Sequence, residues 1–189
     1  TQLDTTNVVD EKMRQCGLVA VMLLMLIAVG FGPSANAQIK ASNKNGEVSF
    51  AGEHAGMKFE GVFERWNATL DLPPSTNPSI IATFDLTTAK TGDSTYDSTL
   101  PEGDWFDVEN HPQGNFKSTK IVASKDAYAV TGILTLRGKS LPIEFVLNQK
   151  GSELHASFDI DRLAYGIGLD SDPDADWVSQ DINMTITIR

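Results

Sequence analysis

Residues 127–149 read AYAVTGILTLRGKSLPIEFVLNQ. Apolar side chains recur at every second position from Tyr128 to Leu136 and again from Ile143 to Leu147, a period typical of strands that bury one face. Between the two rows, Arg137-Gly138-Lys139 contains the glycine that a tight reversal favours. This stretch therefore predicts an antiparallel hairpin, and the same alternation guides the interpretation of the rest of the chain.

The alternation recurs on both sides of this hairpin. It appears toward the C-terminus in Leu154 to Ile160 and in Ile182 to Ile188, and toward the N-terminus in four more rows. Counted in this way, the strands number eight, built around Val48 and Phe50, residues 59–72, residues 80–86, Phe116 and Ser118, and residues 128–136, 143–147, 154–160 and 182–188. We expect an all-β fold, a single antiparallel eight-stranded barrel, whose interior is just wide enough for side chains or for one small elongated ligand.

Two segments depart from simple alternation. The apolar phase changes from odd positions at Phe59 and Phe63 to even positions after Arg65, which predicts a β-bulge near Arg65 that bends one long strand. Residues 91–112 carry Asp- and Gly-rich turns and predict one or two short helices that lie across an open end of the barrel. Three glycines are expected to mark tight bends: Gly61, Gly132 and Gly166.

The first 37 residues have the layout of a secretory signal peptide. Lys12 and Arg14 precede an apolar run that extends to Phe31, and the segment ends in the small-x-small pattern Ala35-Asn36-Ala37. The strongly apolar core has 14 residues, whereas a helix that spans a bilayer needs roughly 20. We therefore expect cleavage after Ala37 and no stable membrane insertion of the remainder, with Met13 as the start of translation.

The remaining segment, residues 38–189, is the expected barrel domain, and it is acidic. The loss of residues 1–37 removes two of 15 basic and three of 25 acidic side chains, which leaves 13 and 22 and a formal charge of −9. Because nucleic-acid binding requires clustered Lys and Arg, this balance argues against a nucleic-acid partner. The only cysteine, Cys16, lies in the segment that we expect to be removed. The fold must then be stabilised by its apolar core without a disulfide.

Five groups of motifs follow one another between Gly46 and Ile188. They are Val48-Ser49-Phe50 with His54-Ala55-Gly56 and Phe59-Glu60-Gly61-Val62-Phe63, Trp105-Phe106-Asp107-Val108 with Pro112, Phe116-Lys117-Ser118-Thr119, the hairpin Val130 to Pro142, and Arg162 with Tyr165-Gly166-Ile167-Gly168. In this order and spacing they resemble the YceI-like family of periplasmic, lipocalin-like proteins that bind polyisoprenoids. The resemblance covers nearly the whole segment after the signal peptide.

The resemblance implies a lipocalin-like closed barrel whose long hydrophobic cavity holds an isoprenoid lipid or the tail of an isoprenoid quinone. Leu100, Trp105 and Phe106 would close or gate the mouth, and His54 and Tyr96 are candidate polar contacts there. One departure from the family pattern lies at this mouth, where Tyr96-Asp97 and Thr99-Leu100 replace an Arg-Asp pair followed by His-Leu. The side chains expected to line the cavity are Phe50, Phe59, Phe63, Phe84, Leu100, Trp105, Phe106, Phe116, Leu134, Leu136, Phe145, Phe158 and Ile186.

The leading hypothesis is therefore a periplasmic carrier of an isoprenoid ligand, and two alternatives stay open. The barrel could be filled by its own side chains and serve as an envelope stress-response or protein-interaction module, with or without homodimerisation. An isomerase or hydrolase that uses His54 is the third reading. The sequence contains no GxSxG, P-loop or HExxH motif. We therefore expect no enzyme, no cofactor and no metal.

The acidic segment Asp170 to Asp176 has one feature of a calcium-binding loop, since Asp181 falls at the twelfth position counted from Asp170. Such a loop requires glycine at its sixth position, where Ala175 stands, and usually ends in Glu. The sequence also places Pro173 inside the loop. We therefore interpret it as a solvated acidic loop and keep calcium binding as the alternative.

Overall fold

The computed structural model describes residues 38–189, which form one antiparallel sheet of eleven strands. The expected signal peptide, with Met13, Cys16 and the cleavage point after Ala37, lies outside the described residues. The strands in sheet order are β1 (Ile39–Ser42), β4 (Trp66–Asp71), β5 (Ser79–Asp85), β7 (Gln113–Ala123), β8 (Ala127–Leu136), β9 (Lys139–Lys150), β10 (Glu153–Asp161), β11 (Asp181–Ile188), β2 (Gly46–His54), β3 (Met57–Phe63) and β6 (Ala89–Lys90).

The expected count of eight strands is wrong, for three reasons. Residues 59–72 form two strands, β3 and β4, with different neighbours in the sheet. β6 has only two residues, too short to show any period. β1 presents a single buried side chain, Ala41, while Ile39 lies at the surface, so its apolar row has one member.

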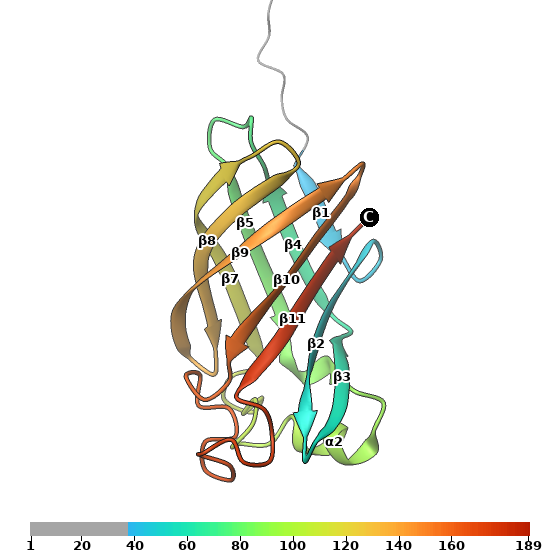
Figure 1. The fold of residues 1–189 in the computed structure, drawn as a ribbon, viewed down its shortest axis with the longest axis vertical. Coiled ribbons are helices and arrows are strands. Elements are labelled where there is room, and N and C mark those ends of the chain that lie inside the picture. Colours follow the sequence, from blue (N-terminus) through green and yellow to red (C-terminus); the bar gives the residue numbers. More distant parts are fainter. Residues whose placement is uncertain (1–37) are drawn as a thin grey trace, which may run out of the picture. The chain divides into compact units, whose positions relative to one another are not determined.

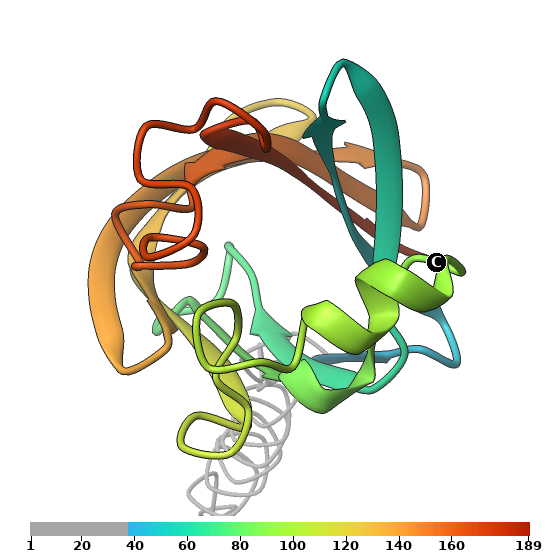
Figure 2. The ribbon, with the colours of Figure 1, turned by 90° about the horizontal axis from the view of Figure 1, so that it is seen from below.

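The sheet curls on itself as the prediction of a barrel requires, but its hydrogen bonding is open. Figure 1 shows the long strands wrapping around a common axis, and Figure 2 shows them end-on around that axis. Within residues 38–189 no ladder joins the two edge strands, β1 and β6. The closed barrel is therefore corrected to a curled, barrel-like sheet.

The bend near Arg65 is present, but it is a break between β3 and β4 and not a bulge within one strand. It is held by the 3-10 helix η1 (Leu86–Thr88): the Glu64 N–H donates to the Thr88 carbonyl, and the Arg65 N–H donates to Thr88 Oγ1. Arg65 also forms an ion pair with Asp85 at 2.8 Å. These contacts turn the chain from one side of the curled sheet to the other, which explains the change in apolar phase.

The hairpin of residues 127–149 forms as predicted. β8 pairs with β9 in antiparallel register from Ala127–Asn148 to Leu136–Lys139. Arg137 and Gly138 form the two-residue turn with φ of 47° and 70°, the left-handed conformations that this turn type requires. The alternation is confirmed on both strands, because Val130, Leu134, Leu136, Phe145 and Leu147 are all buried.

Gly61 and Gly132 lie inside the strands β3 and β8 and not in turns. A Cβ at Gly132 would lie 2.4 Å from the Phe116 ring, and one at Gly61 would lie 2.3 Å from the Phe50 ring. Both glycines therefore make room for an aromatic ring that lies across the neighbouring strand. Gly166 differs, since its φ of 75° belongs to a turn.

One end of the curled sheet carries the irregular segments (Figures 1 and 2). Within residues 91–112, the structure contains the single helix α2 (Ser94–Thr99), followed by turns to residue 110. The other segment at this end is the loop between β10 and β11, residues 162–180, which we call the 162–180 loop. In residues 38–189 no helix is long and apolar enough to cross a membrane.

Candidate ligand-binding site

The inward rows of the curled sheet surround an apolar cavity of about 120 Å³. Its wall consists of 29 residues from the loops and from every strand except β1 and β6, and Arg162 is the only charged residue among them. The wall includes all thirteen side chains that the sequence nominated: Phe50, Phe59, Phe63, Phe84, Leu100, Trp105, Phe106, Phe116, Leu134, Leu136, Phe145, Phe158 and Ile186. Their contact with a ligand stays a prediction.

Aromatic rings give the cavity much of its shape. Phe145 stacks on Phe158 with ring centroids 4.8 Å apart, and Phe116 lies 5.6 Å from Phe145 on the other side. Across the cavity, Phe106 meets Phe50 edge-on, with centroids 6.5 Å apart. Such offset and edge-on pairs fix ring positions beyond what burial alone does. The cavity is therefore a narrow apolar space bounded by rings.

Sequence reasoning missed sixteen residues of the wall. Most of them, such as Ile143 and Ile182, occupy further apolar positions of the predicted strands. Apolar alternation alone would have been enough to nominate these residues. Arg162 comes directly after β10, two residues beyond the inward-facing Ile160, and a charged side chain is rarely buried. Val178 and Ile167 lie in irregular segments, where no period exists. The missed residues are Val48, Trp66, Ala68, Leu70, Ile80, Ala82, Leu86, Ile143, Leu147, Ile160, Arg162, Ile167, Val178, Ile182, Met184 and Ile188.

A second, more polar space of about 250 Å³ lies beside α2, and we call it the mouth. It shares Phe59, Leu100, Trp105 and Val178 with the wall of the apolar cavity, so the two spaces adjoin. Its remaining lining residues are His54, Thr91, Thr95, Tyr96 and Thr99. Together the two spaces reach the lower end of the range of roughly 300–1,000 Å³ that is usual for small-molecule sites.

His54 and Tyr96, the two residues nominated as polar contacts, meet in the mouth. Tyr96 Oη lies 2.8 Å from His54 Nδ1, a hydrogen bond whose donor depends on the tautomer of the ring. Tyr96 is positioned because Asp93 caps α2 and accepts from the N–H groups of Thr95 and Tyr96. His54 ends β2, where it bridges to Val178 of the 162–180 loop. In the described part of the chain no hydrogen bond joins His54 to a carboxylate, and Tyr96 is its side-chain partner.

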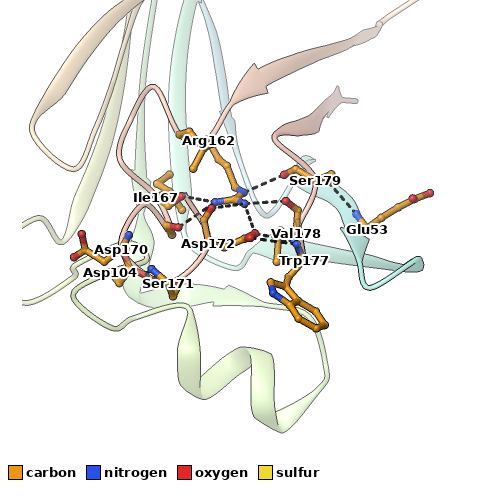
Figure 3. Close-up of polar contacts among 12 residues, drawn as sticks. Glu53, Asp104, Arg162, Ile167, Asp170, Ser171, Asp172, Trp177, Val178 and Ser179 are labelled. Atoms are coloured by element: carbon orange, nitrogen blue, oxygen red, sulfur yellow. Dashed lines mark hydrogen bonds and ion pairs between the residues drawn. The ribbon is translucent and has the colours of Figure 1, made fainter. Parts of the chain in front are cut away.

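Arg162 holds the 162–180 loop together from inside (Figure 3). Its side chain is 2% exposed, and its guanidinium donates to the carbonyls of Ser179, Ile167 and Val178 at 2.8–3.0 Å. Nη2 also contacts Asp172 Oδ2 at 2.6 Å. The Trp105 ring lies 5.9 Å from the guanidinium carbon, within reach of a cation–π contact. One buried side chain thus ties three parts of the loop to the mouth.

The solvated-loop interpretation is wrong for Asp172, whose side chain is only 6% exposed. Burial raises the pKa of this carboxyl, but the N–H groups of Val178 and Trp177 and the Arg162 guanidinium outweigh it and lower the pKa below 3.8. Both oxygens of the Asp172 carboxylate are therefore engaged inside the loop. Within residues 38–189 no group of three acidic or histidine side chains could hold a metal ion.

The 162–180 loop is also joined to the loop after α2. Asp104 accepts the N–H groups of Asp170 and Ser171 at 2.9 and 3.0 Å (Figure 3). Burial raises the pKa of Asp104, but these bonds and the Ser171 hydroxyl bring the pKa below 3.8. The segment that carries Trp105 and the segment that carries Val178 are therefore fixed to each other at the mouth.

The sequence profile of the YceI-like domain matches residues 39–189, the whole of the curled sheet. The chain belongs to the YceI-like family. A UPF0312 protein of Serratia proteamaculans is 24% identical over 178 residues, which cover 87% of this chain and 91% of that protein. Protein YceI of Escherichia coli O157:H7 is 25% identical over 123 residues, 63% of this chain and 64% of that protein.

Two solved structures resemble this fold. BcnA of Burkholderia cenocepacia superposes with a TM-score of 0.69 and 26% identity, covering 76% of this chain and 94% of its own. A polyisoprenoid binding domain from Saccharophagus degradans, implicated in plant cell wall breakdown, has a TM-score of 0.60 over 80% of this chain and 96% of its own. At 11% identity, the second likeness shows the fold alone.

Proposed function

We propose that this YceI-like protein binds the hydrophobic chain of an isoprenoid lipid or isoprenoid quinone in its apolar cavity and carries it through the periplasm. The observation that supports this most strongly is the wall of the cavity, in which 28 of 29 residues are apolar. Such a wall is apolar along almost its whole length, so it favours a ligand that is also apolar along its length.

Burial of such a ligand supplies enough free energy for a stable complex. An isoprenoid tail that loses several hundred Å² of apolar surface to the cavity gains on the order of 10 kcal/mol before ordering costs, at about 25 cal/mol per Å². The likeness to a solved polyisoprenoid binding domain supports the same ligand class at the level of the fold. Periplasmic location follows from the expected signal peptide and is part of the proposal.

The test places a charge on either face of one strand. Phe145 lines the cavity and is 9% exposed, whereas its neighbour Val146 points outward and is 50% exposed. We expect Phe145→Glu to abolish binding of geranylgeraniol, an alcohol probe with four isoprene units, and Val146→Glu to leave this binding unchanged. Binding is measured by titration calorimetry on protein purified without detergent, with circular dichroism to check the fold.

A second variant keeps the cavity apolar and only reduces its size. Ala82 is buried in the wall, so Ala82→Leu adds methyl groups to a space of about 120 Å³ without adding charge. We expect weaker geranylgeraniol binding in a folded protein. Unchanged binding in both Phe145→Glu and Ala82→Leu would show that the ligand does not enter this cavity. Absence of binding in the unaltered protein would favour the filled-barrel interaction module.

A further inference from the structure

We propose that the protein pairs with a second copy of itself through the outer face of β7, β8 and β9, with a two-fold axis parallel to β8. The three strands lie side by side in the sheet, and β5 continues the same face on the other side of β7 (Figure 1). We call this surface the β8 face. It is made of the outward side chains of three cross-strand rows, which are centred on Ala129, Thr131 and Ile133 of β8.

The first and third rows expose large apolar side chains. In the first row, Val122 of β7 and Val146 of β9 lie on either side of Ala129, and each is about half exposed. In the third row, Ile133 of β8 and the half-exposed Ile81 of β5 lie on either side of β7. Contiguous exposed apolar surface of this kind marks interaction sites on soluble proteins.

The middle row carries opposite charges at its two ends. Lys120 of β7 and Glu144 of β9 flank Thr131 in the two ladders, and both charged side chains are exposed. Because neighbouring strands lie about 4.8 Å apart, the two residues stand about 10 Å from each other across β8. Within residues 38–189 neither side chain forms an ion pair. The row therefore presents one free positive and one free negative charge.

A two-fold axis parallel to β8 brings these opposite charges together. It places β8 of one copy on β8 of the other, β7 over β9, and each cross-strand row opposite itself. Lys120 of each copy then faces Glu144 of the other, which gives two ion pairs per dimer, and Val122 faces Val146. A two-fold interface must be complementary to itself. The three rows meet that requirement in charge and in apolar contact.

The lengths of the side chains also suit a second copy. The outer surface of a curled sheet is convex, so two copies approach most closely along the central strand and less closely at its flanks. The central strand presents the short side chains of Ala129 and Thr131, whereas the flanking strands present the longer Lys120 and Glu144. Short side chains let the two β8 strands approach, and the long ones reach across the wider gap beside them.

The size of the β8 face predicts weak pairing. With strands about 4.8 Å apart and a rise of about 3.4 Å per residue, a face four strands wide and about eight residues long covers about 500 Å² on each copy. Two copies would bury about 1,000 Å² in total, near the lower limit for a specific interface. Exposed ion pairs add little each and are screened by salt. We therefore expect a dimer with a Kd in the micromolar range that is weaker in high salt.

Sedimentation velocity of the processed protein tests the inference over a concentration range from micromolar to several hundred micromolar. We expect a shift from monomer to dimer across this range. Lys120→Glu and Glu144→Lys each turn two attractive pairs into two repulsive ones, so each should weaken the dimer by about tenfold or more. Lys58→Glu is the matched control, because it reverses the same charge at an exposed position of β3, outside the β8 face. Circular dichroism checks the fold of every variant.

The two charge reversals should cancel each other when they are combined. The double variant Lys120→Glu/Glu144→Lys restores both pairs with their signs exchanged, so it should dimerise like the unaltered protein. An equal mixture of the two single variants should form a mixed dimer at concentrations where each variant alone is monomeric. Both recoveries depend on residue 120 of one copy facing residue 144 of the other.

The possible results either support or overturn the pairing. A dimer that the single reversals weaken, and that the double variant and the mixture restore, would support it. Monomer over the whole range would overturn it, and monomer that cosediments with phosphatidylcholine vesicles would assign the exposed apolar side chains to a lipid surface instead. A dimer that neither single reversal weakens would also overturn it, because its interface would lie elsewhere.

Discussion

Arg162 Nη2 lies 2.6 Å from Asp172 Oδ2, with the two side chains 2% and 6% exposed. The pair is surrounded by the backbone of the 162–180 loop, which accepts from the guanidinium and donates to the carboxylate. A buried ion pair is weak evidence of net stabilisation on its own, but the loss of one partner leaves the other charged and unpaired. The pair therefore fixes the conformation of the loop that borders the mouth.

Asp172→Ala should destabilise the protein by roughly 3–5 kcal/mol, the usual effect of leaving a buried charge without its partner. Asp174→Ala is the matched control, because Asp174 lies exposed in the same loop and should change stability little. Urea unfolding followed by circular dichroism measures both. Equal effects of the two substitutions would contradict the role given to the pair.

Acid should weaken the contribution of Asp172 to the stability of the folded protein. Its pKa is below 3.8 in the folded protein, so its contribution to stability is present above the unfolded value and is lost as pH falls through the folded pKa. Asp172→Asn removes this titration. We expect the stability gap between the unaltered protein and Asp172→Asn to narrow as pH falls below about 4. A gap that stays constant down to the acid transition would show that Asp172 titrates normally.

Tyr165 should limit stability in alkali. Burial raises the pKa of its hydroxyl from 10.0 to about 12, and within the described residues that hydroxyl has no hydrogen-bond partner. Because the folded pKa is raised, stability is intact below pH 10.0 and declines as pH rises toward about 12. Tyr165→Phe should be neutral or stabilising at neutral pH and should unfold less readily in alkali. Thermal melting temperatures of both proteins, measured between pH 10.0 and about 12, test this. Equal declines in melting temperature would contradict the role given to Tyr165.

Gly132 should tolerate no side chain. A Cβ there would lie 2.4 Å from the Phe116 ring and 2.7 Å from the Lys117 carbonyl oxygen, so Gly132→Ala must move a ring that lines the cavity. We expect a loss of about 1–3 kcal/mol, typical of overpacking. Gly103→Ala is the control, because nothing lies within 4 Å of its added Cβ. A Gly132→Ala protein as stable as the control would contradict the close packing.

Apolar alternation along the sequence predicted the strands that bury several side chains on one face. It could not predict strands with only one buried side chain. The 127–149 hairpin and its register follow from apolar alternation and one left-handed turn. β1 and β6 have one buried side chain each, so nothing in their sequences distinguishes them from loops. The break at Arg65 depends on contacts with Thr88, a residue that is distant in the sequence.

The candidate site likewise contains residues that the sequence could predict and residues that it could not. The thirteen nominated side chains lie in the wall because most belong to inward rows, and the rings of Trp105 and Phe106 come from an apolar cluster in a loop. The burial of Asp172 could not be predicted, because three neighbouring aspartates of similar spacing stay at the surface. Its partner Arg162 lies ten residues away, and only the folded loop brings them together.

The central claim is that the apolar cavity carries an isoprenoid chain, and its most direct test is to identify what the protein holds in the cell. The precursor is expressed in a bacterium, and the processed protein is purified from the periplasm without detergent. Native mass spectrometry of the complex and of its solvent extract then measures ligand mass and stoichiometry. The account predicts an isoprenoid alcohol or quinone at close to one per protein. Protein that is repeatedly empty, and that takes up no added isoprenoid, would contradict it.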